Sequence, residues 1–170
     1  MPHSQDESRT RRYGWSDPRI AVDALRQMSG KDYFTAIMGG SIPAPPIMDT
    51  LAFRLTEVGD GRIVFVCEPG EFLYNAIGSV HGGVPATLID SAASCAVHTT
   101  LPVGTGYTTV NLAVDMIKGI TATAGLLRCE GRVVRAGARI AVADAELKGA
   151  DGTLYARGSA TCLILRPAKA

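Results

Sequence analysis

Asp90 is the residue of this 170-residue chain whose surroundings point most clearly to chemistry. It is the only aspartate, glutamate, lysine or arginine between Glu71 and Asp115, and the residues beside it are small or apolar. A carboxylate removed from water without a partner costs free energy, and it becomes a better base near neutral pH. Asp90 is therefore a candidate general base. The alternative is a structural strut that accepts a hydrogen bond from a neighbouring hydroxyl.

A histidine and two glycines, His81-Gly82-Gly83, precede the segment that carries Asp90. Glycines at the start of a helix let the backbone approach a ligand, and the first N–H groups of a helix have no partner within it. With the helix dipole, these groups could stabilise the oxyanion that forms when a carbonyl is attacked. The alternative is a tight turn next to a histidine that makes only structural hydrogen bonds.

Two further polar side chains are candidates for the same site. Asn75 could hold a carbonyl or a water, or it could close an Asx turn. Thr108 belongs to an alternating segment, and we expect its hydroxyl to point toward Asp90 and to hold a water there. The alternative is that Thr108 bonds to a backbone carbonyl. The face of the segment that turns toward the helix is predicted to carry Thr108, Val110, Leu112, Val114 and Met116.

A helix is expected to hold Asp90. Residues 84–101 fit one, because Pro85 suits the first turn and small residues cover nearly the whole circumference. A helix with such small side chains packs close to other backbone on most sides. We therefore predict an α+β fold in which one long central helix is wrapped by a five- to six-stranded antiparallel sheet.

The strands of this sheet are predicted from alternating and β-branched runs. The first two flank the turn Gly59-Asp60-Gly61 and form a hairpin. Another strand follows the central helix, and three more lie near the C-terminus. The predicted strands cover residues 50–58, 62–68, 106–117, 123–135, 138–149 and 153–165.

A helical extension is expected before the sheet. Asp17 can cap a helix that begins at Pro18, and a second helix follows Ser29-Gly30 and ends at Gly39-Gly40. The face that the first helix buries is predicted to carry Ile20, Ala24, Leu25 and Met28. We divide the chain into a loose polar segment at 1–17, helices with an extended Pro-rich lead-in at 18–46, and the main domain at 47–167.

Composition narrows the class of protein. Seventeen lysines and arginines balance sixteen aspartates and glutamates, which excludes a basic footprint for nucleic acid. The N-terminus is too polar for a signal peptide, and no apolar run is long enough to span a membrane. The mean hydropathy of +0.15 suggests that a partner subunit covers apolar surface. Four scattered cysteines predict neither a metal site nor disulfides, but buried thiols in a reducing cytoplasm.

The candidate residues form a pattern with defined spacing. It reads Asn75-x5-His81-Gly82-Gly83-x6-Asp90, followed by Gly106-Tyr107-Thr108-Thr109. This pattern resembles the hot-dog-fold acyl-CoA thioesterases of the phenylacetate-degradation (PaaI) type, over about residues 30–166. The resemblance implies hydrolysis of an acyl-CoA to the free acid and coenzyme A, with no metal or further cofactor. It also implies a homodimer whose sites lie at the interface, and pairing of dimers into a homotetramer.

The resemblance implies a role for each residue of the pattern. Asp90 would act as general base or nucleophile and would face the Gly82 loop of the partner. The Gly82 backbone N–H, helped by Asn75, would polarise the thioester carbonyl. Thr108 would orient the water, and His81 would support the loop.

The resemblance also marks substrate contacts. Gly83, Thr109 and Gly137 are candidates for this role. Arg135 and Arg139 could hold the phosphates of coenzyme A, or they could be solvated charges at a turn.

Two other functions stay open at this stage. A hot-dog protein without catalytic activity would bind an acyl-CoA and release no thiol. A hot-dog dehydratase or hydratase would use His81 for acid–base chemistry and would hydrate an enoyl-CoA.

Overall fold

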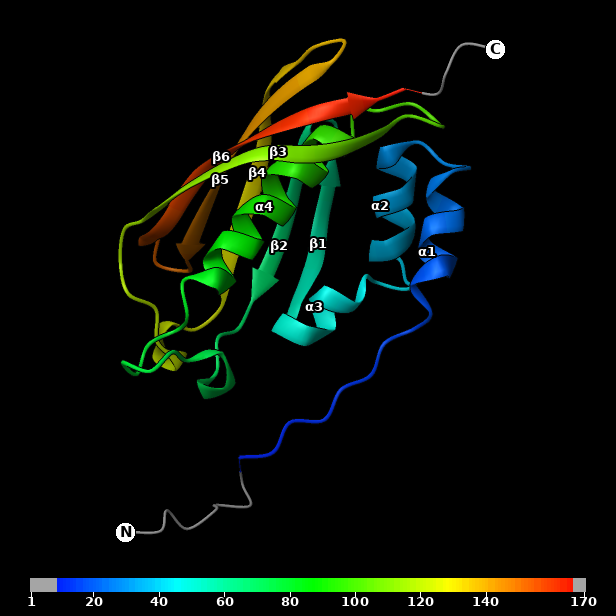
Figure 1. Cartoon of the computed structure of the whole chain (residues 1–170). Coiled ribbons are helices and arrows are strands. Elements are labelled where there is room, and N and C mark those ends of the chain that lie inside the picture. The colour runs from blue at the N-terminus through cyan, green and yellow to red at the C-terminus, as the bar shows by residue number, and fades with distance from the viewer. Residues whose placement is uncertain (1–8, 167–170) are drawn as a thin grey trace, which may run out of the picture.

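The computed structural model describes residues 9–166, which form a six-stranded antiparallel sheet and a central helix (Figure 1). The strand order is β1-β2-β4-β5-β6-β3. The strands are β1 (Phe53–Gly59), β2 (Arg62–Cys67), β3 (Gly106–Met116), β4 (Leu127–Ala136), β5 (Ile140–Gly149) and β6 (Leu154–Leu165). The helices are α1 (Pro18–Leu25), α2 (Gly30–Met38), α3 (Pro46–Leu51) and α4 (Gly83–His98), with short 3₁₀ turns η1 (Glu71–Leu73) and η2 (Ala122–Ala124).

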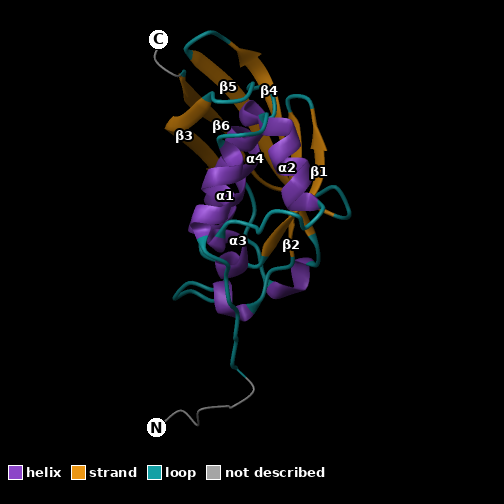
Figure 2. Ribbon diagram, turned by 90° about the vertical axis from the view of Figure 1, so that its right-hand side faces the viewer, coloured by secondary structure: helices purple, strands orange, loops and turns teal. Residues whose placement is uncertain are grey.

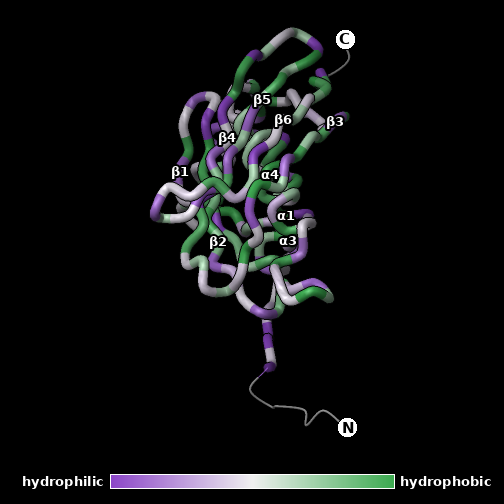
Figure 3. The backbone as a smooth tube through the Cα atoms, turned by 90° about the vertical axis from the view of Figure 1, so that its left-hand side faces the viewer, coloured by the Kyte–Doolittle hydropathy of each residue, from purple (hydrophilic) through white to green (hydrophobic). Residues whose placement is uncertain are grey.

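This architecture confirms the predicted α+β fold with one central helix and six strands. The sheet curves around α4, and five of its strands pack against that helix (Figure 1). Burial alternates along most of β4 and β5, because successive side chains face the helix and the outside in turn. Figure 3 shows hydrophilic and hydrophobic residues mixed along these strands. Part of the predicted segment 1–17, namely residues 1–8, and the end of the predicted domain at residue 167 lie outside the described residues.

Small residues let α4 lie directly on the backbone of the sheet. Ala92, Ala93 and Ala96 have no exposed surface. A Cβ atom added to Gly131 of β4 would lie only 2.0 Å from the carbonyl oxygen of Ala92. At Gly158 of β6 it would lie 2.7 Å from the side chain of Ile89 of α4. The close helix–sheet packing expected from the small side chains is confirmed.

Several predicted boundaries are wrong. The first strand begins at Phe53 and not at residue 50, because α3 occupies residues 46–51. Pro46 suits the first position of that helix, and Ala52 ends it in a left-handed conformation with φ of 54°. The predicted strand at 123–135 begins only at Leu127, since η2 precedes it. The central helix ends at His98 and not at residue 101.

The N-terminal helices begin where the sequence predicts. Asp17 accepts a hydrogen bond from the Arg19 N–H, and Ser29 caps α2. The buried face of α1 differs from the prediction, because Ala21 is buried whereas Ile20 is 53% exposed. Figure 2 shows α1 and α2 side by side. Residues 9–17 form no helix or strand, but Arg11 is tied to the carbonyls of α3.

The cysteines form no disulfide. Cys67, Cys129 and Cys162 are buried, as predicted, and Cys95 is partly buried. Burial raises the pKa of the Cys67 thiol to about 11, so this thiol is protonated at neutral pH. Among residues 9–166, no helix has the length and apolar character needed to cross a bilayer.

Candidate active site

Asp90 lies in the middle of α4 and is half-buried. Its Oδ1 atom accepts a hydrogen bond of 2.9 Å from the Thr109 hydroxyl of β3. Within residues 9–166 no lysine, arginine or histidine forms an ion pair with Asp90, and Oδ2 accepts no hydrogen bond. The Thr109 hydroxyl therefore fixes one oxygen of the carboxylate, and the other oxygen remains available to accept a hydrogen bond from a ligand or a water.

The hydroxyl that reaches Asp90 belongs to Thr109 and not to Thr108. A β-bulge at Val110 shifts the register between β3 and β6. Beyond the bulge, Ala113 and Asp115 face outward, yet before it Thr109 faces the helix. One extra residue reverses the alternation of side chains, so Thr108 is turned outward and exposed. The prediction that Thr108 points toward Asp90 is wrong in this chain.

The loop before α4 is closed by its own hydrogen bonds. The His81 N–H donates to the Leu73 carbonyl at 2.8 Å, and Tyr74 pairs with Val80. The Gly83 N–H donates to Nδ1 of His81 at 2.9 Å, so it is already occupied. In the described part of the chain, the Gly82 N–H has no acceptor. Gly82 thus offers a free donor at the helix start, and His81 supports the loop.

Asn75 closes an Asx turn, one of the two interpretations left open by the sequence. Its Oδ1 accepts from the N–H groups of Ile77 and Ser79, at 3.0 and 3.3 Å. Its Nδ2 donates to the Ser79 hydroxyl at 3.1 Å. An amide nitrogen carries two N–H groups, so one remains for a ligand.

Gly82 and Asp90, the candidate oxyanion donor and the candidate base, lie far apart along α4. Gly82 precedes Asp90 by eight residues, which corresponds to about 12 Å along a helix that rises 1.5 Å per residue. An oxyanion donor must lie about 3 Å from the oxygen it stabilises, and the attacking group lies equally close to the carbon. The Asp90 carboxylate therefore cannot directly attack a carbonyl whose oxygen is held by the Gly82 N–H of the same chain.

The hairpin between β4 and β5 carries the predicted phosphate contacts. Arg135, Gly137 and Arg139 are exposed there. Figure 1 shows that the hairpin lies at the opposite end of the molecule from the start of α4. Gly137 is needed for the turn, because an added Cβ would lie 2.6 Å from the Ile140 carbonyl oxygen. In one chain these three residues and Asp90 form no common cluster.

His98 is a buried residue that the sequence analysis does not single out. It ends α4 and packs between the rings of Tyr33, Phe34 and Tyr107. Burial lowers the pKa of His98 from 6.5 to about 4, so the imidazole is neutral at pH 7. Its apolar neighbours make it a core residue, and only the fold brings α2 against it.

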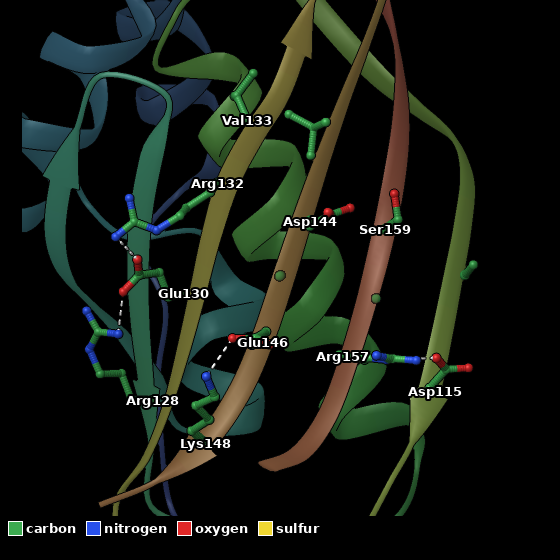
Figure 4. Close-up of a pocket in the computed structure, with 14 residues that line it drawn as sticks. Asp115, Arg128, Glu130, Arg132, Val133, Asp144, Glu146, Lys148, Arg157 and Ser159 are labelled. Carbon is green, nitrogen blue, oxygen red and sulfur yellow. Dashed lines mark hydrogen bonds and ion pairs between the residues drawn. The ribbon is translucent and has the colours of Figure 1, made fainter. Parts of the chain in front are cut away.

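A hollow of about 700 Å³ lies on the outer face of the sheet, with α4 behind the strands (Figure 4). Ion pairs line it, among them Arg128 with Glu130 and Arg157 with Asp115. Partial burial raises the pKa of Glu130, but hydrogen bonds from Arg62 and Arg128 outweigh this effect and lower it to about 2. This hollow is separate from Asp90 and holds a structural network of charges.

A long central helix wrapped by an antiparallel sheet is the arrangement of the hot-dog fold. Residues 77–156, which include α4 and Asp90, match the model of the thioesterase superfamily. This match agrees with the resemblance to hot-dog thioesterases seen in the sequence. No protein of curated function matches the chain in sequence.

Solved structures of similar fold support this assignment. AziG from S. sahachiroi is 27% identical, with a TM-score of 0.69 over 73% of this chain and 98% of that one. A phenylacetic acid degradation-related protein from Ralstonia eutropha JMP134 is 29% identical, with a TM-score of 0.70 over 77% and 98%. The E. coli PaaI protein of the phenylacetic acid degradation operon shares the fold, at 19% identity and a TM-score of 0.68 over 80% and 94%.

Proposed function

We propose that the protein hydrolyses an acyl-CoA thioester to the free acid and coenzyme A. The match of residues 77–156 to the thioesterase superfamily supports the reaction class. The observation that carries the proposal is the carboxylate of Asp90, which Thr109 holds by Oδ1 while Oδ2 stays available. The unoccupied N–H of Gly82 supplies the matching oxyanion donor.

The reaction follows from these groups. With Asp90 as general base, its carboxylate takes a proton from water, and the resulting hydroxide attacks the thioester carbonyl. The negative charge that develops on the carbonyl oxygen is stabilised by the Gly82 N–H. Collapse of this intermediate breaks the carbon–sulfur bond, and the thiolate of coenzyme A leaves and takes up a proton. With Asp90 as nucleophile, the carboxylate attacks first and water then hydrolyses the mixed anhydride.

A second copy of the chain is needed to complete the site, because about 12 Å separates Asp90 from Gly82 along one helix. β3 is an edge strand, and it exposes Val110, Leu112 and Met116. An edge with unpaired backbone groups and exposed apolar side chains favours pairing with another chain. We propose a homodimer in which the β3 edges meet and the partner's Gly82 loop reaches Asp90.

Assembly and location are two further parts of the proposal. From the resemblance alone, we propose that two dimers pair into a homotetramer. We also propose a cytoplasmic location, because the four cysteines form no disulfide, as expected in a reducing compartment.

The substrate class is tested by thiol release. The wild-type protein is supplied with aromatic, short, medium and long acyl-CoAs, and free thiol is followed with a chromogenic disulfide. We expect rapid release from one class. Binding of an acyl-CoA with no thiol release from any of them would favour the non-catalytic alternative. Hydration of an enoyl-CoA that His81→Ala abolishes would favour the dehydratase.

A further inference from the structure

Arg11 makes an unusual set of contacts for a residue outside any helix or strand. Its guanidinium donates from Nη1 to the Thr50 carbonyl at 2.8 Å and from Nη2 to the Asp49 carbonyl. Both carbonyls belong to the last turn of α3, where a cation is favourable. The Asp49 carbonyl also accepts a long hydrogen bond of 3.4 Å from the Ala52 N–H. Arg11 is thereby fixed on a rigid element.

The same guanidinium stacks on Phe72. Its central carbon lies 4.5 Å from the centroid of the Phe72 ring and 4.4 Å from that of Tyr13. The Phe72 ring is 50% exposed, so the core does not enclose it. On another side the ring lies against Gly70, where an added Cβ would be 2.6 Å from Cε1. Arg11 thus holds a ring that is otherwise half in solvent.

Phe72 is connected to the Gly82 loop through its neighbour in the chain. The next residue, Leu73, accepts the 2.8 Å hydrogen bond from the His81 N–H, and Gly82 follows. Direct contacts therefore connect Arg11 to Phe72, and through Leu73 and His81 to the free N–H of Gly82. Neither Arg11 nor Phe72 lies within the 77–156 segment that matches the superfamily.

We propose that Arg11 is a positioning residue for the Gly82 oxyanion donor and acts through Phe72 and Leu73. This inference rests on the proposed hydrolysis, because a donor needs accurate placement only if a carbonyl is polarised there. A small displacement of a catalytic group lowers the rate of the chemical step far more than it changes substrate binding.

Arg9 lies two residues before Arg11 and provides a matched control. It pairs with Glu71, the neighbour of Phe72, but both side chains are more than 60% exposed. Exposed ion pairs contribute little to stability or placement. Arg9→Gln therefore removes a charge from the same segment and leaves the contacts of Arg11 in place.

The test compares Arg11→Gln, Phe72→Leu and Arg9→Gln with the wild-type protein. We expect about a tenfold loss of kcat with Arg11→Gln, with KM within about twofold. Phe72→Leu should give a similar loss, and the double variant should lose no more than the worse single variant, because both act along one path. Arg9→Gln should keep wild-type kcat.

Hydrogen–deuterium exchange gives a readout that does not depend on turnover. The amides of residues 73–83 should exchange several-fold faster in Arg11→Gln, while those of α4 beyond Asp90 stay unchanged. Wild-type kcat in Arg11→Gln, or wild-type exchange in residues 73–83, would overturn this inference. A wild-type protein that hydrolyses no acyl-CoA would instead overturn the proposed function.

Discussion

The Thr109 hydroxyl donates a 2.9 Å hydrogen bond to Oδ1 of Asp90, and a single extra residue in β3 makes this contact possible. Without the bulge at Val110, Thr109 would share the outward face of Ala113 and Asp115. β-bulges commonly re-aim side chains beside active sites. Here the bulge supplies the Asp90 carboxylate with a neutral donor that fixes its orientation.

Replacing Thr109 tests this contact. Thr109→Val keeps the shape and removes the donor, and a hydrogen bond to a charged group contributes about 1.5–3 kcal/mol. If the bond orients the base, kcat should fall about 10- to 100-fold with little change in KM. Steady-state thiol release measures both constants. Thr108→Val makes the same chemical change on the outward face, and a larger loss there than in Thr109→Val would contradict the structure.

The helix–sheet packing predicts a strong effect of one methyl group. Gly131→Ala would place a Cβ 2.0 Å from the Ala92 carbonyl oxygen, which neither backbone can avoid. We expect the free energy of unfolding to fall by about 3 kcal/mol or more. Urea denaturation measures the change. Gly119→Ala, which meets no atom within 4 Å, is the control and should alter stability by less than about 0.5 kcal/mol.

The buried imidazole of His98 predicts a pH dependence of stability. Burial lowers its pKa to about 4, whereas the unfolded chain binds this proton near pH 6.5. As the pH falls, the unfolded state takes up the proton before the folded state does. The free energy of unfolding therefore decreases by up to about 3 kcal/mol between about pH 6.5 and pH 4. Denaturation at several pH values measures the slope. His98→Gln should flatten it in this window, and an unchanged slope would show that other groups cause it.

The exposed edge of β3 predicts a link between assembly and activity. Leu112 is 36% exposed on this edge, and Leu112→Lys would place a charge in the proposed interface. We expect light scattering to detect monomers, and thiol release to be lost with the dimer. Val103→Lys changes an exposed residue after α4 and should affect neither. A monomer with full activity would show that one chain holds the whole site.

The central helix α4 was predictable because its residue types and spacing are distinctive in the sequence. Small residues recur through residues 84–98, and Asp90 is conspicuous in a stretch of 43 residues without another formal charge. The glycines at 82 and 83 mark the helix start directly. These features depend on residue type and spacing alone, so no tertiary information was needed.

Other features depend on contacts that spacing does not reveal. The bulge at Val110 adds one residue to an alternating run, and the run looks equally regular with either threonine facing inward. The helix α3 could not be predicted from the Pro-rich stretch, because a proline suits both an extended lead-in and the first turn of a helix. The ring contact between Arg11 and Phe72 joins residues 61 positions apart, and only the folded chain brings them together.

Mixing two inactive variants tests whether each site combines Asp90 of one chain with Gly82 of its partner. Asp90→Asn removes the base. Gly82→Pro removes the donor N–H, and proline fits the φ of −57° at this position. Each variant alone should release thiol at less than about a hundredth of the wild-type rate.

The two variants are denatured together in equal amounts and refolded. Half of the resulting dimers are mixed, and each mixed dimer has one intact site and one that lacks both groups. We expect recovery of about a quarter of the wild-type rate, because the dimer is isologous and its sites are shared. If Asp90 and Gly82 of the same chain formed the site, mixing would restore no activity, and a shared site would be excluded.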